Sequence, residues 1–466
     1  MTTEATYRPD GASFRDPASR VFVRDGQILR GLSDEGLEDW QKLAATTFFA
    51  EAQASGRIVA TELAGDDVRL DGFAATLRHE RIPFVSYPYE WPFGMLKDAA
   101  LLHLDLLEAA LGEDMILKDA SPYNVQWRGA VPVFTDIGSF ERLRPGQPWI
   151  GYRQFCMQFL YPLLLQALRD VSFRPWLRGS VDGIAPDEIA RVLSRRDKLR
   201  RGVLSHVVLH SRLERRYEDK PRDLDKELEG AGFRKELIEA NVRGLRKLVR
   251  GLEWSPPTTA WTQYRDANSY TDADAARKLE LVGEVIGSRR WPLVWDLGAN
   301  DGRFARLAAE AGSYVVAVDA DPAVSELLYR ELAAERNELI HPIVVDLADS
   351  SPALGWRGAE RKPLAERGRP DLTLCLALVH HLAITRSIPL PEIVAWLADL
   401  GGTLVVELPT PEDPMVQRLL AAKRLSATHE YGVEPFEQAL TERFTIERRE
   451  TLPSGTRHLF VARARL

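Results

Sequence analysis

The second half of the chain alternates short apolar runs with amphipathic stretches of helical period. The apolar runs lie at 291–294, 314–318, 343–345, 371–378 and 402–408. Runs that are apolar throughout are typical of parallel strands buried on both faces of a sheet. Because strand-length and helix-length segments alternate, the pattern predicts an α/β fold with a Rossmann-like sheet in this half.

The first half begins with extended segments, and helices follow. Val21–Arg30 is expected to form a hairpin, and Ser33–Ala54 a helix that Ser33 caps. A strand is expected at Arg57–Leu63 and a long amphipathic helix at Phe93–Leu111. The stretch 151–253 has a mostly helical pattern. This order predicts a separate α+β domain with a helical C-terminal part.

The clearest break in the pattern is Trp254–Thr259, which contains two consecutive prolines. A length of 466 residues exceeds that of one typical domain. We therefore expect two domains, over residues 1–253 and 254–466.

Composition restricts the classes of partner. The hydrophobic fraction of 45% and the charged fraction of 28% are ordinary for a globular protein, and the net charge of −7 gives no reason to expect nucleic acid. Cys156 and Cys375 both lie in apolar runs, so a disulfide framework is not expected. Met1–Asp10 lacks the apolar core of a signal peptide, and no apolar run has the length of a membrane span. A cytoplasmic enzyme is the expectation.

The segment from Trp295 to Phe304 carries the strongest chemical signal. Two glycines, Gly298 and Gly302, follow Asp296 at the end of a predicted strand, and a predicted helix begins directly afterwards. Such a strand–turn–helix lets backbone approach a ligand closely. The next predicted strand ends in Asp319, roughly 20 positions later, where an acidic side chain can bind ribose hydroxyls.

This pattern resembles the first motif of class I S-adenosylmethionine (SAM) methyltransferases. A dinucleotide site fits less well, because Asn300 stands where the dinucleotide fingerprint has its second glycine. The resemblance covers about residues 260–466 and implies that Asp296, Gly298, Asn300, Gly302 and Asp319 bind SAM. It also implies that the last two strands, near 444–448 and 458–463, form an antiparallel pair.

Further cofactor contacts follow from the same resemblance. An acidic residue after the third strand commonly accepts the adenine amino group, and we favour Asp346 over Asp349, which fits a helix N-cap better. Tyr264 and Tyr270 precede the first strand, where such enzymes often cover the cofactor. Aromatic packing at a domain edge is an equally good interpretation of the two tyrosines.

The acceptor is expected at the carboxyl end of the fourth strand. His380 and His381 follow that strand, and a histidine can act as a general base near neutral pH. We favour His381 as the base or orienting group, and Glu407, at the tip of the fifth strand, is a second candidate. The expected reaction is in-line transfer of the SAM methyl group to an oxygen or nitrogen nucleophile.

The first half carries a second set of motifs. Asp119 and Asn124 are spaced as Asp-x4-Asn, and a short predicted strand later ends in Asp136-x-Gly138. These motifs resemble the catalytic centre of the protein-kinase and aminoglycoside-phosphotransferase fold. The resemblance implies ATP as a ligand, Asp119 as the catalytic base, and Asn124 and Asp136 as Mg²⁺ ligands.

The chain departs from that pattern in two places. It has no glycine-rich loop and no V-A-I-K strand, and Arg30 is the only cation in the expected region. All three acidic and amide residues could instead be turn formers. The first half is therefore expected to have the kinase-like fold, with phosphoryl transfer and ligand binding both open as its role.

Three functions remain open from the sequence. The first is a SAM-dependent methyltransferase whose kinase-like half binds or presents the acceptor. The second is a bifunctional kinase–methyltransferase that phosphorylates and then methylates a glycan or small molecule. The third is a scaffold with a SAM-sensing half. The whole-chain arrangement is similar to bacterial methyltransferases of the nodulation-protein type, and neither the acceptor nor the oligomeric state is indicated.

Overall fold

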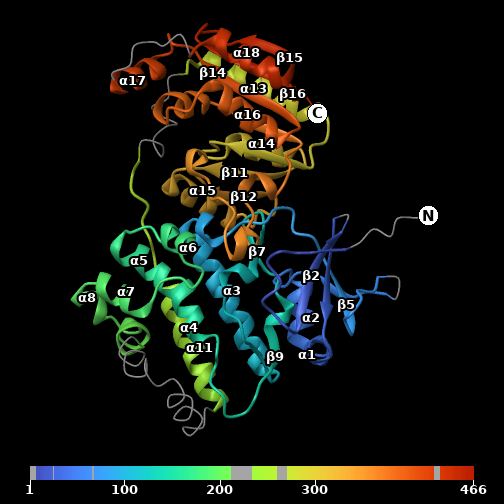
Figure 1. Ribbon diagram of the computed structural model, residues 1–466. Coiled ribbons are helices and arrows are strands. Elements are labelled where there is room, and N and C mark those ends of the chain that lie inside the picture. Colours follow the sequence, from blue (N-terminus) through green and yellow to red (C-terminus); the bar gives the residue numbers. More distant parts are fainter. Residues whose placement is uncertain are drawn as a thin grey trace. The chain divides into compact units, whose positions relative to one another are not determined.

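The computed structural model describes residues 7–24, 26–65, 68–210, 234–259, 270–423 and 431–465 (Figure 1). The chain forms two compact units. Unit 1 comprises Met1–Trp127, Pro132–Ser255 and Ala353–Arg361. Unit 2 comprises Arg128–Val131, Pro256–Pro352 and Lys362–Leu466. The main division thus lies in the proline-containing segment, and one short segment on each side of it belongs to the other unit.

Unit 2 is built on a seven-stranded sheet in the order β12-β11-β10-β13-β14-β16-β15. The strands are β10 (Leu293–Leu297), β11 (Tyr314–Asp319), β12 (Ile340–Val344), β13 (Leu372–Cys375), β14 (Thr403–Pro409), β15 (Phe444–Thr451) and β16 (Arg457–Ala464). The first five pair in parallel, and β16 is antiparallel to both of its neighbours. The predicted α/β class is confirmed.

The burial of the strands explains their apolar sequences. All seven residues of β14 are buried, although successive side chains point to opposite faces, so both faces of this strand are covered. The described α-helices of the unit are α13 (Asp272–Gly287), α14 (Arg303–Glu310), α15 (Pro322–Ala334), α16 (Leu390–Leu400), α17 (Pro414–Lys423) and α18 (Val433–Arg443). The connections through α14 and α15 bring the carboxyl ends of β10, β11 and β12 to one edge of the sheet.

Unit 1 begins with a five-stranded antiparallel sheet in the order β1-β2-β3-β5-β4. Its strands are β1 (Arg8–Pro9), β2 (Ser19–Arg24), β3 (Gln27–Leu32), β4 (Thr61–Leu63) and β5 (Ala75–His79). Two helices separate β3 from β4: α1 (Asp34–Ala44) and α2 (Thr47–Ala54). The single helix expected over Ser33–Ala54 is wrong, because Thr46 adopts an extended conformation and its hydroxyl donates to the Leu43 carbonyl at 2.6 Å. Ser33 caps α1 as expected.

The second part of unit 1 is organised around the buried helix α3 (Phe93–Gly112). Two small sheets follow it, in which β6 (Met115–Leu117) pairs with β9 (Phe140–Arg142), and β7 (Val125–Arg128) with β8 (Val131–Phe134). The remaining described helices are α4 (Tyr152–Phe155), α5 (Tyr161–Arg169), α6 (Arg174–Gly179), α7 (Pro186–Val192), α8 (Arg195–Lys198) and α11 (Lys235–Arg250). The Lys118 amide donates to the Ser139 carbonyl at 2.9 Å, so the loops after β6 and β8 lie beside one another.

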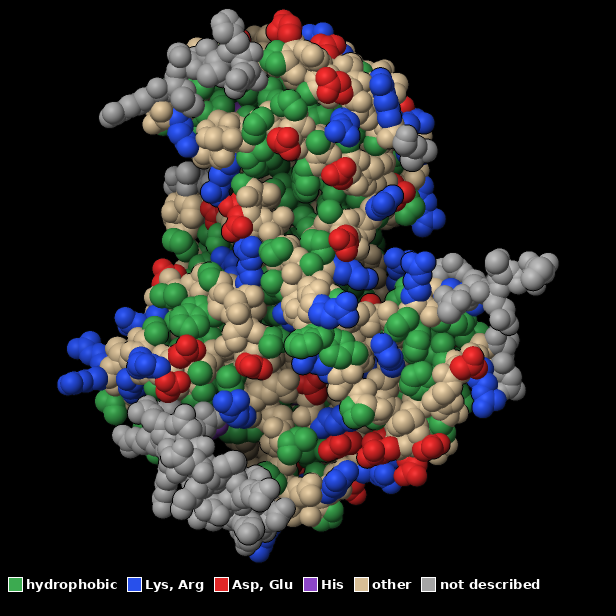
Figure 2. All heavy atoms as spheres, viewed as in Figure 1, with side chains coloured by type: hydrophobic (Ala, Val, Ile, Leu, Met, Phe, Trp, Pro, Cys, Tyr) green, Lys and Arg blue, Asp and Glu red, His purple; other side chains and the backbone are tan. Residues whose placement is uncertain are grey.

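The charge of the surface and the length of the apolar helices can both be described. On the face shown in Figure 2, acidic and basic side chains lie among one another. Within the described ranges, no helix combines the length and the apolarity that crossing a membrane requires.

Candidate cofactor site

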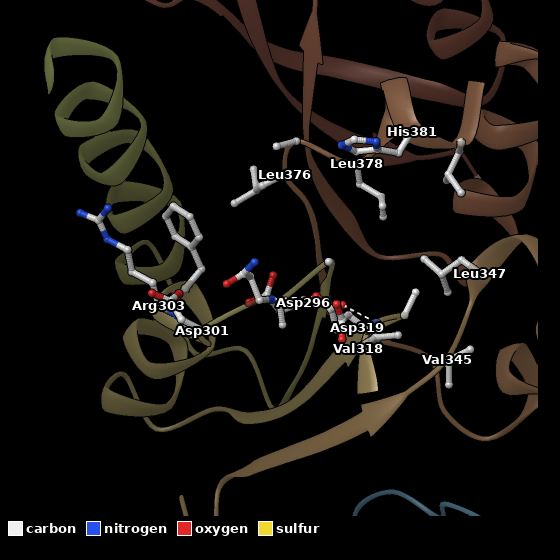
Figure 3. A pocket seen from close by; sticks show the side chains of 18 of the residues that line it. Asp296, Asp301, Arg303, Val318, Asp319, Val345, Leu347, Leu376, Leu378 and His381 are labelled. Carbon is white, nitrogen blue, oxygen red and sulfur yellow. Dashed lines mark hydrogen bonds between the residues drawn. The ribbon is translucent and has the colours of Figure 1, made fainter. Parts of the chain in front are cut away.

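A cavity of about 400 Å³ opens at the carboxyl ends of the parallel strands of unit 2. It is lined by residues that follow β10, β11, β12 and β13, together with residues of α13 and the segment before it (Figure 3). The strand order reverses at β10: β11 and β12 lie on one side of it and β13 and β14 on the other, although all five strands are parallel. Ligands of open α/β sheets bind at such a switch point, so this cavity is the expected ligand site.

The turn after β10 has the backbone conformation that its glycines predict. Gly298 and Gly302 have φ of +78° and +74°, and Asn300 between them has φ of +47°. The amides of Gly298 and Ala299 both donate to the Val318 carbonyl, at 2.8 and 3.0 Å. At Gly302 an added Cβ would lie 2.7 Å from Leu328 Cδ1. The turn is thus tied to β11, and it lines the cavity with little side-chain bulk.

Asp319 lies at the end of β11 and faces the cavity near its centre (Figure 3). One carboxylate oxygen accepts from the Asn300 amide at 3.0 Å, and the other from the Asp321 amide at 2.9 Å. Burial raises the pKa of Asp319, and these backbone hydrogen bonds oppose the rise. Each oxygen keeps acceptor capacity, so the side chain is suited to receive two hydroxyl donors from a ligand.

Asp296 and Lys278 place opposite charges at the same cavity. Burial raises the pKa of Asp296 to about 7, although the charge of Lys278 lowers it. Asp296 Oδ2 is buried and has no hydrogen-bond partner in the described part of the chain. Lys278 comes from α13, and burial lowers its pKa against the charge of Glu407. A carboxyl group beside an ammonium group complements a zwitterionic amino-acid moiety.

A buried ion cluster holds Lys278 in place. Its ammonium donates to Glu407 Oε2 at 2.7 Å and to the Tyr270 hydroxyl at 2.8 Å. The Tyr270 hydroxyl donates to Glu407 Oε1 at 2.6 Å. Arg457 donates to Glu407 Oε1 at 2.9 Å and to Asp413 Oδ2 at 2.8 Å. Tyr270 thereby lines the cavity from a fixed position, whereas Tyr264 lies outside the described residues.

Glu407 was expected to face the crevice, but it is fully buried and is not among the residues that line the cavity. Burial opposes its ionisation, yet Lys278 and Arg457 outweigh that effect and lower its pKa to about 2. Such a carboxylate is a poor proton acceptor at neutral pH. The geometry favours a positioning role for Glu407, through Lys278 and Tyr270.

Asp346 follows β12 and lines the cavity. It caps the single turn Leu347–Asp349 by accepting from the Ala348 amide at 3.0 Å, and its other oxygen pairs with the Arg386 guanidinium. The assignment of the cap to Asp349 was therefore wrong, because Asp349 is the last residue of that turn and not its cap. Asp346 is close enough to the cavity to meet a ligand amino group.

His381 lies across the cavity from Asp319, on the segment after β13 (Figure 3). Burial and the charge of Arg457 lower its pKa to about 4, so its imidazole is neutral at pH 7. The His380 ring, whose centroid lies 4.0 Å from that of His381, is almost fully buried and does not line the cavity. Of the two histidines, His381 is placed to meet an acceptor.

The kinase-like motif residues come together in unit 1. The Asn124 amide nitrogen donates to Ser139 Oγ at 3.1 Å, and the Ser139 hydroxyl donates to Asp136. Asp136 also pairs with Arg30 at 2.8 Å. Burial and the charge of Asp136 raise the pKa of Asp119, which lies in the loop after β6. Among the residues described, no group of three or more His, Cys, Asp or Glu side chains is arranged to hold a metal ion.

Three residues of the unit 2 site were not predicted from the sequence: Lys278, Arg386 and Arg457. Each is an isolated cation in an ordinary amphipathic helix, turn or strand, and each meets its acidic partner only through the tertiary fold. The one available signal was a lysine on the inward face of the amphipathic stretch that forms α13. An apolar helix face rarely includes a lysine without a buried partner.

Comparison with known proteins gives one close whole-chain relation. No protein-family model matches the sequence. The chain is 31% identical over 454 residues to the nodulation protein NoeA of Rhizobium meliloti (strain 1021), covering 96% of this chain and 94% of that protein.

Among solved structures, the N-methyltransferase NodS from Bradyrhizobium japonicum WM9, in complex with S-adenosyl-L-homocysteine, is 15% identical with a TM-score of 0.33. That match covers 45% of this chain and 100% of NodS. The PH0226 protein from Pyrococcus horikoshii OT3 is 19% identical with a TM-score of 0.31, covering 43% of this chain and 98% of that one. Since the relation to NoeA extends over nearly all of both sequences, the chain belongs to the family of the nodulation protein NoeA.

Proposed function

We propose that the chain is a SAM-dependent methyltransferase acting on an oxygen or nitrogen nucleophile of a small molecule or glycan. The observation that carries the proposal is the cavity at the switch point of the sheet, where the glycine turn, Asp319 and the Asp296–Lys278 pair meet. Its volume of about 400 Å³ falls in the range of small-molecule sites.

Each part of SAM has a chemically matched partner in this cavity. Asp319 would accept from the ribose hydroxyls, and Asp346 from the adenine amino group. Asp296 would accept from the amino group of the methionine moiety, while Lys278 would bind its carboxylate. Bound SAM supplies an electrophilic methyl group. His381, neutral at pH 7, would orient the acceptor by a hydrogen bond, and the proton that the acceptor loses would pass to solvent, because the low pKa makes this imidazole a weak base.

Binding of SAM to the full chain, measured by calorimetry, tests this proposal. Asp319→Ala should weaken SAM binding roughly 10- to 100-fold, because hydrogen bonds to a charged acceptor are lost. Asp371→Ala is the matched control. Its carboxylate also accepts a backbone amide at a strand end of the same sheet, that of Leu293 at 2.9 Å, and it does not line the cavity. Equal affinity of Asp319→Ala and the parent would refute the assignment.

We also propose that unit 1 has the kinase-like fold and binds or presents the acceptor. The support is its strand order, in which β3 lies next to β5 and β5 next to β4, with α1 and α2 between β3 and β4. The loop with Asp119 and Asn124 then follows β6, and Asp136 follows β8. Whether this unit transfers phosphate depends on the surroundings of Asp136.

A further inference from the structure

Arg30 occupies a buried position between the antiparallel sheet of unit 1 and the loop after β8. Its side chain projects from β3 and is only 9% exposed. One guanidinium nitrogen lies 2.8 Å from Asp136 Oδ1, and another donates to Ser19 Oγ at 2.9 Å. The third nitrogen lies 3.4 Å from His79 Nε2. A permanent cation is therefore in direct contact with the carboxylate that the kinase-like pattern assigns to Mg²⁺.

The remaining groups of the expected metal site are also engaged within the protein. Asp136 Oδ2 accepts from the Ser139 hydroxyl, and Ser139 Oγ accepts from the Asn124 amide at 3.1 Å. Both carboxylate oxygens thus have hydrogen-bond donors, and the negative charge is neutralised without an ion.

Gly138 makes this arrangement possible. An added Cβ there would lie 2.9 Å from Arg30 Nη1 and 3.0 Å from Ser19 Oγ. A side chain at this position would press on the contact between Arg30 Nη1 and Ser19 Oγ, so one of the two groups would have to move. In this chain the glycine of the Asp-x-Gly motif leaves space for the Arg30 side chain.

The residues present do not fit a magnesium ion. Mg²⁺ needs oxygen ligands at about 2.1 Å in octahedral geometry. Here a guanidinium lies 2.8 Å from Asp136 Oδ1 and a hydroxyl donates to Oδ2, so the ion would have to displace one of these donors. Arginine remains protonated at all accessible pH values, so the pair does not open by deprotonation. The neighbouring His79 adds no charge, because burial and Arg30 lower its pKa to about 3.

We propose that Arg30 is a built-in substitute for the metal ion, so that unit 1 binds its ligand without Mg²⁺ and does not transfer a phosphoryl group. The inference rests on the kinase-like fold proposed for unit 1, and it is independent of SAM binding in unit 2. It favours the methyltransferase over the bifunctional kinase–methyltransferase.

Four full-length proteins test the proposal: the parent, Arg30→Ala, Asp136→Asn, and the double variant Arg30→Ala/Asp136→Asn. The probes are Mn²⁺ followed by electron paramagnetic resonance, Mg·ATP followed by calorimetry, and the effect of Mg²⁺ on Tm. The parent should respond to none of them. Arg30→Ala exposes an unpaired carboxylate, so it should lose thermal stability and regain part of it when Mg²⁺ is added. The double variant should not respond to Mg²⁺, because the carboxylate is gone.

Two results would overturn the proposal. One is binding of Mn²⁺ or Mg·ATP by the parent that Asp136→Asn abolishes. The other is a folded Arg30→Ala protein whose Tm ignores Mg²⁺. If Arg30→Ala does not fold, Mn²⁺ and Mg·ATP binding by the parent still test the proposal. Arg30→Lys, which keeps the charge, should also fail to bind Mn²⁺. SAM titrations on the same samples separate this outcome from a failure of the methyltransferase assignment.

Discussion

Lys278 connects the cavity of unit 2 to the buried ion cluster behind it. Its ammonium is bound on one side by Glu407 and Tyr270, and the same side chain lines the cavity. A buried ammonium is costly unless its hydrogen-bonding capacity is used. Two of its three donors have these partners, which leaves one for a ligand carboxylate.

Lys278→Met should therefore weaken binding of SAM and leave binding of 5′-methylthioadenosine nearly unchanged. The second ligand keeps the adenine and ribose but lacks the amino-acid moiety. We expect a loss of roughly 10- to 100-fold for SAM, the value of one charge-assisted hydrogen bond. Calorimetric titration of both ligands into the same variant measures the difference.

Arg277→Met is the matched control for Lys278→Met. Arg277 is the preceding residue of α13 and pairs with Glu450, but it does not line the cavity. Its loss should leave both affinities unchanged. If Lys278→Met weakens binding of the two ligands equally, the lysine maintains the shape of the cavity and does not bind a carboxylate.

At the scale of elements, the turn between β10 and α14 combines a backbone requirement with close packing. Gly302, at the start of α14, has φ of +74° and no room for a Cβ beside Leu328. Gly312, just after the same helix, has φ of +84° with nothing within 4 Å of its Cβ position. The two glycines differ in steric surroundings and share the left-handed conformation.

Gly302→Ala should thus destabilise unit 2 more than Gly312→Ala does. Both variants force a non-glycine residue into a left-handed conformation, at a cost of about 1–2 kcal/mol. Only the first also drives a methyl group against Leu328. Urea unfolding of both variants measures the difference, and equal losses would mean that Leu328 moves aside at no cost.

The elements that sequence predicted well are those whose signal is local. The turn at Gly298 and Gly302 and the acidic residue at the end of β11 all lie within one βαβ unit, so their spacing fixes their relation. The break between α1 and α2 was not predicted although it is local. The hydrogen bond from the Thr46 hydroxyl to the Leu43 carbonyl does not change the pattern of apolar and polar residues.

Contacts between distant residues were not readable from the sequence. Lys278 meets Glu407 across 129 positions, and Arg457 meets Glu407 across 50. Glu407 was placed at the crevice because it follows an apolar strand, but its orientation depends on those two cations. Arg30 was noted as a cation in the region where kinases have lysine, yet its pairing with Asp136 required the fold of unit 1.

At the scale of the whole molecule, burial of histidines couples stability to pH. Seven described histidines have a pKa that burial lowers: His79, His103, His206, His341, His380, His381 and the partly exposed His458. Each is neutral in the folded state, whereas in the unfolded chain it titrates near 6.5. The unfolded state therefore binds more protons below pH 6.5. The stabilisation is complete above that value and declines as pH falls toward the folded pKa values.

Three carboxyl groups act in the opposite direction. Burial raises the pKa of Asp119, Asp296 and Asp319, so protonation of these groups favours the folded state as pH falls. Carboxylates whose pKa the fold lowers, such as Glu407 and Asp274, also contribute, so the pH dependence of the parent is a sum that isolates none of these sets. A single buried histidine with no charged neighbour is needed to separate them.

His103 meets that condition. It is fully buried on α3, with its ring centroid 5.8 Å from that of Phe155 and 6.2 Å from that of Trp149. Neither ring nitrogen has a hydrogen-bond partner in the described part of the chain, and burial alone lowers its pKa to about 3. The shift in the pKa of His103 therefore comes from loss of hydration alone.

His103→Phe should stabilise the protein by about 2 kcal/mol more at pH 5 than at pH 8, when each is compared with the parent. That figure is the free energy that the unfolded chain gains at pH 5 by protonating an imidazole of ordinary pKa. Any change in packing is common to both pH values and cancels in the difference. Urea unfolding at the two pH values measures it, with the partly exposed His458→Gln as a control that should show a smaller effect. An equal change at pH 5 and pH 8 would mean that His103 titrates in the folded protein as it does in water, and that the aromatic cluster admits a proton.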